Sequence, residues 1–102
     1  MKFGLVIGNV VATQKDSGVS NRKLLLIQPL DDAFKPSGGY LVAVDAVGAG
    51  ESEIILFASG SSARQTELTK DTPCDCVIMA IVDQVECNGK IVFNKSDGLP
   101  SI

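Results

Sequence analysis

Short apolar runs alternate along the chain with polar segments that contain glycine. Residues 2–13 alternate with period two and predict a long first strand, one face of which carries Phe3 and Leu5. Gly4 and Gly8 fall on the opposite face, and glycine inside a strand marks a bend, a bulge or a close approach of two backbones. This pattern favours a small, strongly coiled barrel.

Four further apolar runs predict strands. They cover residues 24–27, 40–47, 54–58 and 76–86. The run at 54–58 is apolar throughout, so we expect it to be buried on both faces. Polar stretches at 14–21 and 31–39 predict loops, because each contains glycine and the second also contains Pro36.

The C-terminal part of the chain predicts a hairpin. Asn88-Gly89 is the strongest short turn signal in the sequence, and it would return residues 90–94 antiparallel onto the end of the fifth strand. Residues 96–102 are expected to form a tail. A short helix is expected at 63–68, ahead of Pro73, because the residue before a proline avoids helical geometry.

Together these elements predict a mainly β fold. We expect a small five-stranded OB-like Greek-key barrel with one short helix and a C-terminal hairpin. The length of 102 residues suits one domain. Residues 1–86 would form the barrel, and 87–102 would add a hairpin strand and tail to that domain. The usual OB helix lies between strands three and four, whereas this one would follow strand four.

The composition is apolar for so small a chain. Hydrophobic residues make up 45% and charged residues 21%. Either part of the apolar surface faces another subunit, or the barrel is simply well filled. The absence of histidine removes the commonest general base and the commonest metal ligand.

Charge and aromatic content disfavour nucleic acid as a partner. The net charge is −3, and the nine basic residues are spread along the chain. DNA binding depends mainly on neutralising phosphates with basic side chains. With one tyrosine, four phenylalanines and no tryptophan, the chain has few aromatic side chains on which bases could stack. No run reaches the roughly 20 apolar residues of a membrane span, and the N-terminus has no signal-peptide pattern. We expect a cytoplasmic protein with no membrane partner.

The three cysteines do not predict a disulfide framework or a metal site. Cys74, Cys76 and Cys87 form an odd set, and three thiolates would hold zinc only with a fourth ligand. Small buried hydrophobes or free thiols are the favoured interpretation. A metal or redox role for Cys74 and Cys76 is a weaker alternative.

Two glycine-containing segments are candidate binding sites. Gly48-Ala49-Gly50 resembles the start of a dinucleotide-binding fingerprint, but no third glycine follows at Glu53, so a turn is favoured. The segment 60–62, Gly-Ser-Ser, could hold an anion at a helix N-terminus. Capping of the helix by a serine is the simpler interpretation.

No catalytic constellation is present. Ser61 or Ser62 would need an adjacent base, and nothing supports a pairing with Lys70. Asp45 and Asp83 could form a paired-carboxylate site, although an aspartate in an apolar strand more often accepts from backbone donors. We therefore expect no enzyme activity and no cofactor.

Several blocks in order along the chain resemble one family. The blocks are Gly4-x-Val6, residues 10–15, 23–30, 42–50 and 60–64, Pro73-x-Asp75 and residues 81–83. The strongest are Val42-Ala-Val-Asp-Ala-Val-Gly-Ala-Gly50 and Gly60-Ser-Ser-Ala-Arg64. Together they span roughly residues 1–86 and resemble the EutN/CcmL family of bacterial microcompartment vertex proteins.

This resemblance implies an OB-like barrel that assembles as a cyclic homopentamer. Such pentamers cap the vertices of a polyhedral shell built mainly from hexameric shell proteins, so the partners would be four copies of the chain and those hexamers. The resemblance implies a structural role in a cytoplasmic shell. Ser52 departs from it, because glycine is expected in the turn after Gly50. The segment 87–102 matches less closely, and we expect it to contact the neighbouring subunit.

The two glycine segments and the start of the 13–18 loop supply the candidates for a subunit interface or a central opening. They are Thr13, Gln14, Lys15, Gly48, Ala49, Gly50, Gly60, Ser61, Ser62 and Arg64. Arg64 would pair with an acid on this chain or a neighbour, or remain solvated. The alternative function is an OB-type module that binds a small anionic ligand or single-stranded nucleic acid, which rests on the barrel pattern alone.

Overall fold

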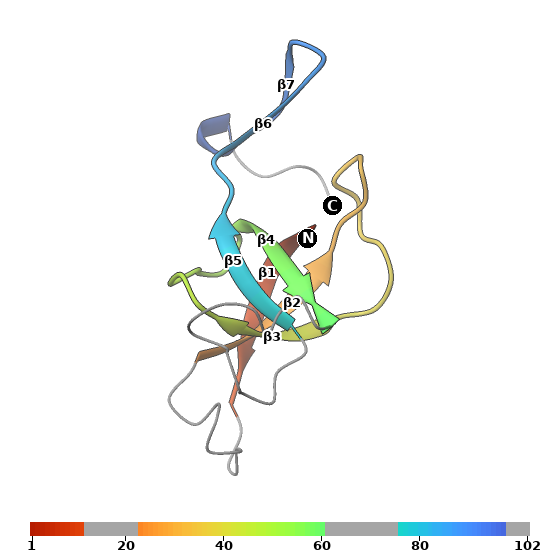
Figure 1. The fold of residues 1–102 in the computed structure, drawn as a ribbon. Coiled ribbons are helices and arrows are strands. Elements are labelled where there is room, and N and C mark those ends of the chain that lie inside the picture. The colour runs from red at the N-terminus through yellow and green to blue at the C-terminus, as the bar shows by residue number, and fades with distance from the viewer. Residues whose placement is uncertain (12–22, 61–75, 98–102) are drawn as a thin grey trace.

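The computed structural model, which describes residues 1–11, 23–60 and 76–97, contains a closed barrel and a hairpin that projects from it (Figure 1). The barrel strands are β1 (Lys2–Val10), β2 (Lys23–Pro29), β3 (Leu41–Asp45), β4 (Ile54–Ser59) and β5 (Cys76–Ile81). The hairpin consists of β6 (Gln84–Cys87) and β7 (Lys90–Asn94), and η2 (Lys95–Asp97) follows it.

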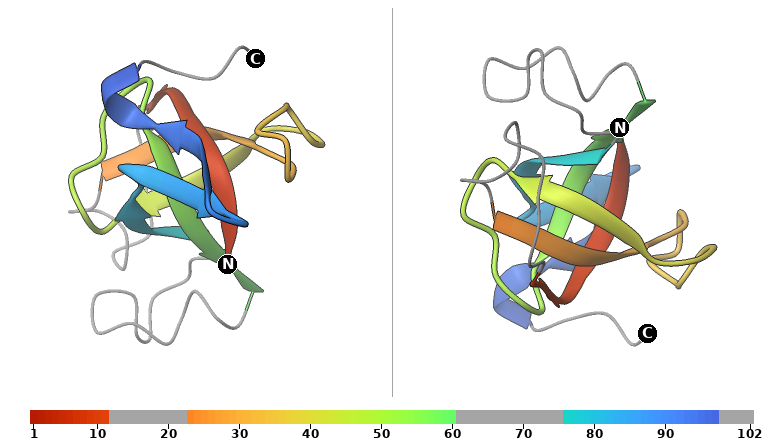
Figure 2. Two further views of the ribbon diagram at one scale, coloured as in Figure 1. Left: turned by 90° about the horizontal axis from the view of Figure 1, so that it is seen from above. Right: turned by 90° about the horizontal axis from the view of Figure 1, so that it is seen from below.

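The order of strands around the barrel is β1-β2-β3-β5-β4, and β4 pairs with β1 to close it. All neighbours are antiparallel except β3 and β5, which are parallel. The views from above and below show the five strands of this closed barrel crossing one another (Figure 2). The expected mainly β, OB-like five-stranded barrel is confirmed. The helix expected at 63–68 lies outside the described residues.

The barrel interior is closely packed around β1. Its core consists of Val6, Leu25, Ile27, Ala43, Ala49, Ile55, Phe57, Cys76 and Ile78. Gly4 faces this interior, where a Cβ atom would come within 2.6 Å of Ile27 Cγ2 and 3.1 Å of the Phe57 ring. The expected close approach at a strand glycine is therefore present at Gly4. At Gly8 the nearest side-chain atom would be 4.0 Å away.

A second apolar cluster lies outside the barrel and joins the hairpin to it. Leu30, Phe34, Ile54, Val82 and Phe93 form this cluster, with Phe3 and Leu5 packed against it. The Phe34 ring centroid lies 5.2 Å from that of Phe3 and 5.8 Å from that of Phe93. Phe3 and Leu5 of the predicted apolar face thus pack on this outer cluster, and Gly4 and Val6 face the interior.

The fifth strand is shorter than expected. Residues 76–86 were expected to form one strand, but β5 ends at Ile81 and β6 begins at Gln84. The Val82 N–H donates to the Ile54 carbonyl, which holds Val82 on the barrel, and the chain leaves the barrel after it. Val77, Met79 and Ile81 alternate along this run, but Ile81 does not share the face of the other two. A register shift opposite Ile78–Ala80 puts Ile81 against the interior and Met79 outside.

Two other strand ends also differ from expectation. β1 ends at Val10 rather than at residue 13. β3 covers Leu41–Asp45 rather than 40–47, because Asp45 starts a turn. The fourth strand is buried along most of its length, as expected. The domain boundary at 86/87 stays a prediction.

The predicted hairpin turn is confirmed. Asn88 and Gly89 both have positive φ, 53° and 80°. Positive φ at both central residues defines the type I′ turn that suits the twist of a hairpin. The pairing of β6 with β7 includes Gln84↔Asn94 and Cys87↔Lys90.

Candidate subunit interface

Asp45 organises the turn that carries the first glycine segment. Its Oδ1 accepts from the backbone N–H groups of Val47 and Gly48 at 3.0 Å each, and from Ala49 at 3.2 Å. Gly48 has a φ of 78°, which a residue without a Cβ adopts easily. The interpretation of Asp45 as an acceptor for backbone donors is therefore confirmed.

A second tight turn follows at 50–53. The Glu53 Oε1 atom accepts from the Gly50 N–H at 2.6 Å, and the Glu53 N–H donates to the Gly50 carbonyl at 3.3 Å. The Ser52 N–H donates to the Val6 carbonyl at 2.8 Å, which ties the turn to β1. Ser52 has a φ of 72°, the conformation in which glycine is favoured. This explains why glycine is expected at that position.

Glu53 also connects this turn to the hairpin. Its Oε2 atom lies 2.7 Å from Lys95 Nζ, and Lys95 Nζ lies 3.9 Å from Asp83 Oδ1. The hydrogen bond from Lys95, followed by that from the Gly50 N–H, lowers the pKa of Glu53 below its ordinary value. The same hydrogen bond raises the pKa of Lys95. The ion pair thus links the base of the hairpin to the 50–53 turn.

The candidate residues that the structure describes occupy two places. Gly48 is exposed and Gly50 half-buried, whereas Ala49 is buried in the barrel core and Lys23 Nζ donates to its carbonyl at 3.4 Å. Gly60 is exposed directly after β4, with a φ of 64°. Figures 1 and 2 show the 46–53 segment and the end of β4 on opposite sides of the barrel. The two glycine segments do not meet within one chain.

The other candidates lie outside the described residues. These are Thr13, Gln14, Lys15, Ser61, Ser62 and Arg64, and the same holds for Lys70 and Cys74. Cys76 is buried and Cys87 is exposed. Within residues 1–11, 23–60 and 76–97, no three His, Cys, Asp or Glu side chains are grouped as metal ligands would be. No helix in these ranges is long and apolar enough to span a membrane.

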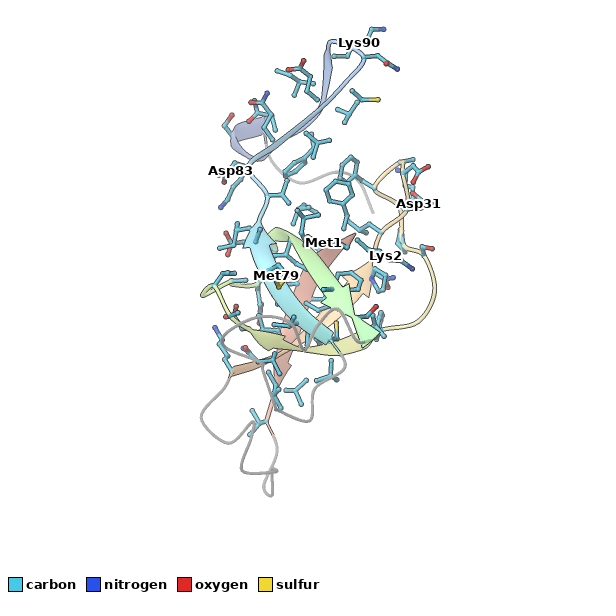
Figure 3. All side chains as sticks on the ribbon, in the orientation of Figure 1. Met1, Lys2, Asp31, Met79, Asp83 and Lys90 are labelled. Carbon is cyan, nitrogen blue, oxygen red and sulfur yellow. The ribbon has the colours of Figure 1, made fainter. Side chains whose placement is uncertain are left out.

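Sequence reasoning missed two features of the surface. One is the outer aromatic cluster that fixes the hairpin, which brings together phenylalanines far apart in sequence. The other is a cleft between the start of β1 and the 30–41 segment, where Figure 3 labels Met1, Lys2 and Asp31. Spacing along the chain carries no signal for either, because both depend on how the barrel closes.

Comparison with known proteins decides the family. The model of the family described as "Ethanolamine utilisation protein EutN/carboxysome" matches residues 1–83. The chain belongs to the EutN/CcmL family. The shell vertex protein EutN of Salmonella typhimurium is 41% identical over 93% of this chain and 96% of its own. The structure of Gloeobacter violaceus CcmL superposes with a TM-score of 0.88 at 40% identity, covering 95% of this chain and all of that chain.

A third relative is a pentameric shell protein. GrpN from Rhodospirillum rubrum, whose structure is that of a pentameric microcompartment shell protein, is 42% identical, with a TM-score of 0.77. The match covers 85% of this chain and 99% of GrpN. EutN/CcmL relatives are shell vertex proteins rather than enzymes, so the expected structural role in a microcompartment shell in the bacterial cytoplasm is confirmed. A homopentamer is supported on the same grounds.

Proposed function

We propose that five copies of this chain form a closed ring that caps a vertex of a microcompartment shell and contacts the hexameric shell proteins around it. The observation that carries the proposal is the likeness to pentameric GrpN over nearly all of that chain. A sheet made only of hexagonal tiles cannot close into a polyhedron, and five-fold pieces supply the corners. The hexameric partners are part of the proposal.

The placement of the two glycine segments fits a ring. A cyclic assembly uses a heterologous interface, in which one side of each subunit contacts a different side of the next. The Gly48–Gly50 turn and Gly60 lie on opposite sides of the barrel, and both present little side-chain bulk. We assign them to the two sides of the interface. Ala49 supports its turn from the core and does not contact a neighbour.

The central opening is assigned to the 13–15 segment and the residues that follow Gly60. Thr13, Gln14 and Lys15 continue from the end of β1, and Ser61, Ser62 and Arg64 continue from the end of β4. Small and polar side chains suit close approach of five copies around an axis. Arg64 would pair with an acid of the adjacent subunit.

Light scattering on the purified full chain tests the ring. One chain has a mass of 10.7 kDa, so five copies have a mass of about 54 kDa. We expect that mass at micromolar concentration and neutral pH. A stable monomer or a closed dimer would refute the ring.

Co-assembly tests the vertex. The chain is produced together with hexameric microcompartment shell proteins, and the particles are viewed by electron microscopy. We expect closed particles with the chain present, and open sheets or tubes without it. Closed particles in both cases would remove the capping role.

A further inference from the structure

The β6–β7 hairpin is an arm held at a fixed angle to the barrel. Phe93 is buried in the outer cluster and packs on Phe34. The Lys95 N–H donates to the Asp83 carbonyl at 2.8 Å, and the Lys95 ammonium reaches Glu53 on the barrel. Figure 3 shows Asp83 at the base of the arm and Lys90 near its tip, well away from the barrel. The arm is thus anchored at one end only.

The free part of the arm exposes apolar side chains. Ile91 is 55% exposed and Val92 is 50% exposed. The arm is a two-stranded sheet, and within the described part of the chain no third strand pairs with it. Isolated two-stranded hairpins are only marginally stable in water, and an exposed strand with apolar side chains tends to pair with another chain. The outer half of the arm therefore has the character of a contact surface.

A second apolar surface lies at the start of β3. Tyr40, Leu41 and Val42 are 65%, 37% and 49% exposed, and they form the longest consecutive run of exposed large apolar residues in the described ranges. The cleft beside Leu41 is lined by Asp31 and Asp32 and also by Lys2 and Met1, whereas Tyr40 and Val42 do not line it. We call Tyr40–Val42 the β3 patch. The β3 patch offers apolar surface to the two aliphatic side chains of the arm, and the exposed carboxylates of Asp31 and Asp32 nearby can pair with the Lys90 ammonium.

Within one chain the outer half of the arm and the β3 patch do not cover each other, and both are exposed. A heterologous ring requires such a pair of different, complementary surfaces on every subunit. We propose that the outer half of the arm lies on the β3 patch of the next subunit, with Lys90 facing Asp31 and Asp32. This inference rests on the proposed ring and names the residues that join its members.

The arm supplements a contact made by the barrel itself. The family model ends at residue 83, directly before β6. The match to pentameric GrpN covers 99% of GrpN with 85% of this chain, so a chain shorter than this one forms a pentamer. Loss of the arm contact should therefore weaken the ring rather than prevent it.

Dilution of full-length variants tests the contact. The double substitution Ile91→Asp and Val92→Asp places carboxylates on the apolar strip, and Tyr40→Asp with Val42→Asp does the same on the β3 patch. The control is Gln84→Glu, which adds a charge to an exposed position at the base of the arm. We expect each double variant to dissociate at a protein concentration about tenfold or more above the wild type. The control should dissociate like the wild type.

Circular dichroism of each variant before dilution verifies that the barrel is folded. A variant that fails this check is replaced by Ile91→Thr with Val92→Thr, or by Val42→Thr, which keep the β-branched shape. Folded variants that dissociate like the wild type would overturn the inference and leave the ring intact. A wild-type chain that is not pentameric would instead overturn the proposed function.

The exposed thiol of Cys87 reports where the arm lies. In a Cys74→Ser background, Cys87 is labelled with a benzophenone maleimide, mixed with isotopically heavy chain, reassembled and irradiated. We expect cross-links from light to heavy chain at peptides containing the β3 patch or Asp31. Cross-links only within one chain would overturn the inference. In a second mixture that also contains hexameric shell protein, cross-links only to that protein would likewise overturn the inference. They would assign the arm to the contact between pentamer and hexamer.

Discussion

At the scale of single residues, two carboxylates and a few backbone angles shape the candidate interface. Asp45 uses one oxygen to hold three consecutive backbone N–H groups, and Glu53 divides its two oxygens between the Gly50 N–H and Lys95. Both acids lie in or beside apolar strands, where an unpaired charge would be costly. Their role is to fix turns. The paired-carboxylate alternative is therefore disfavoured at Asp45, because its carboxylate already accepts hydrogen bonds from its own turn.

Ser52 is the residue whose substitution is most clearly expected to stabilise the fold. Its φ of 72° costs a residue with a Cβ about 1–2 kcal/mol, and glycine returns part of that gain through greater freedom when unfolded. We expect Ser52→Gly to raise the free energy of unfolding by about 0.5–1 kcal/mol, measured by urea denaturation at fixed protein concentration. Ser52→Ala is the control and should give no gain, because alanine has the same Cβ. A destabilised Ser52→Gly would show that the serine hydroxyl supports the turn.

At the scale of elements, the sequence predicted five strands and a hairpin but not how they connect in space. Periodicity identified each apolar run, and Asn88-Gly89 located the hairpin turn. The break after Ile81 was not predictable, since Val82 and Val85 continue the apolar pattern across it. The chain leaves the barrel there because Val82 bonds to Ile54, a partner 28 positions earlier. Local pattern carries no information about such a contact.

The glycines of β1 provide a matched pair for testing the barrel interior. At Gly4 an added methyl group would overlap Ile27 and press on the Phe57 ring, whereas at Gly8 it would meet only Leu26 Cβ at 4.0 Å. Overpacking of a filled core costs about 1–3 kcal/mol. We expect Gly4→Ala to lower the free energy of unfolding by at least that amount, and Gly8→Ala to change it by about 0.5 kcal/mol or less. Equal effects of the two substitutions would contradict the close approach of β1 to β2 and β4.

The ion pair between the 50–53 turn and the hairpin base predicts a pH dependence. The pKa of Glu53 is lower in the folded chain than its ordinary value of 4.5. Its contribution to stability is therefore fully present above about pH 5 and is lost as the pH falls through the folded pKa. Lys95, with a raised pKa, contributes below its ordinary value of 10.5 and loses that contribution only at higher pH.

Urea denaturation between pH 3 and pH 7 (an acid range set by the carboxyl pKa) measures this contribution. We expect Glu53→Gln to flatten the fall in stability on the acid side, and Lys95→Met to do the same by removing the partner. Glu51→Gln, at an exposed neighbour with no ion pair described in the structure, is the matched control. If stability falls toward acid pH in Glu53→Gln as it does in the wild type, the ion pair adds nothing to the stability of the fold.

At the scale of the whole molecule, the surface suits assembly better than ligand binding. The ordered motifs predicted assembly because they identified the family, whereas the apolar composition left open whether the apolar residues fill the barrel or face another subunit. The sequence could not predict which surfaces meet. Both the hairpin arm and the β3 patch become visible only when the barrel closes and leaves Ile91 and Val42 exposed.

The charge of the assembly separates a shell component from an OB-type nucleic-acid binder. Five copies at −3 each carry a net charge of −15 at neutral pH. Phosphate backbones are therefore repelled at long range, most strongly at low salt, where a genuine binder would gain affinity. We expect no change in fluorescence anisotropy of a labelled single-stranded oligonucleotide at about 50 mM salt, where electrostatic binding would be strongest. An OB protein that binds single-stranded DNA serves as the positive control. Binding that weakens as salt is raised would restore the binding-module alternative, whatever the number of subunits in the ring.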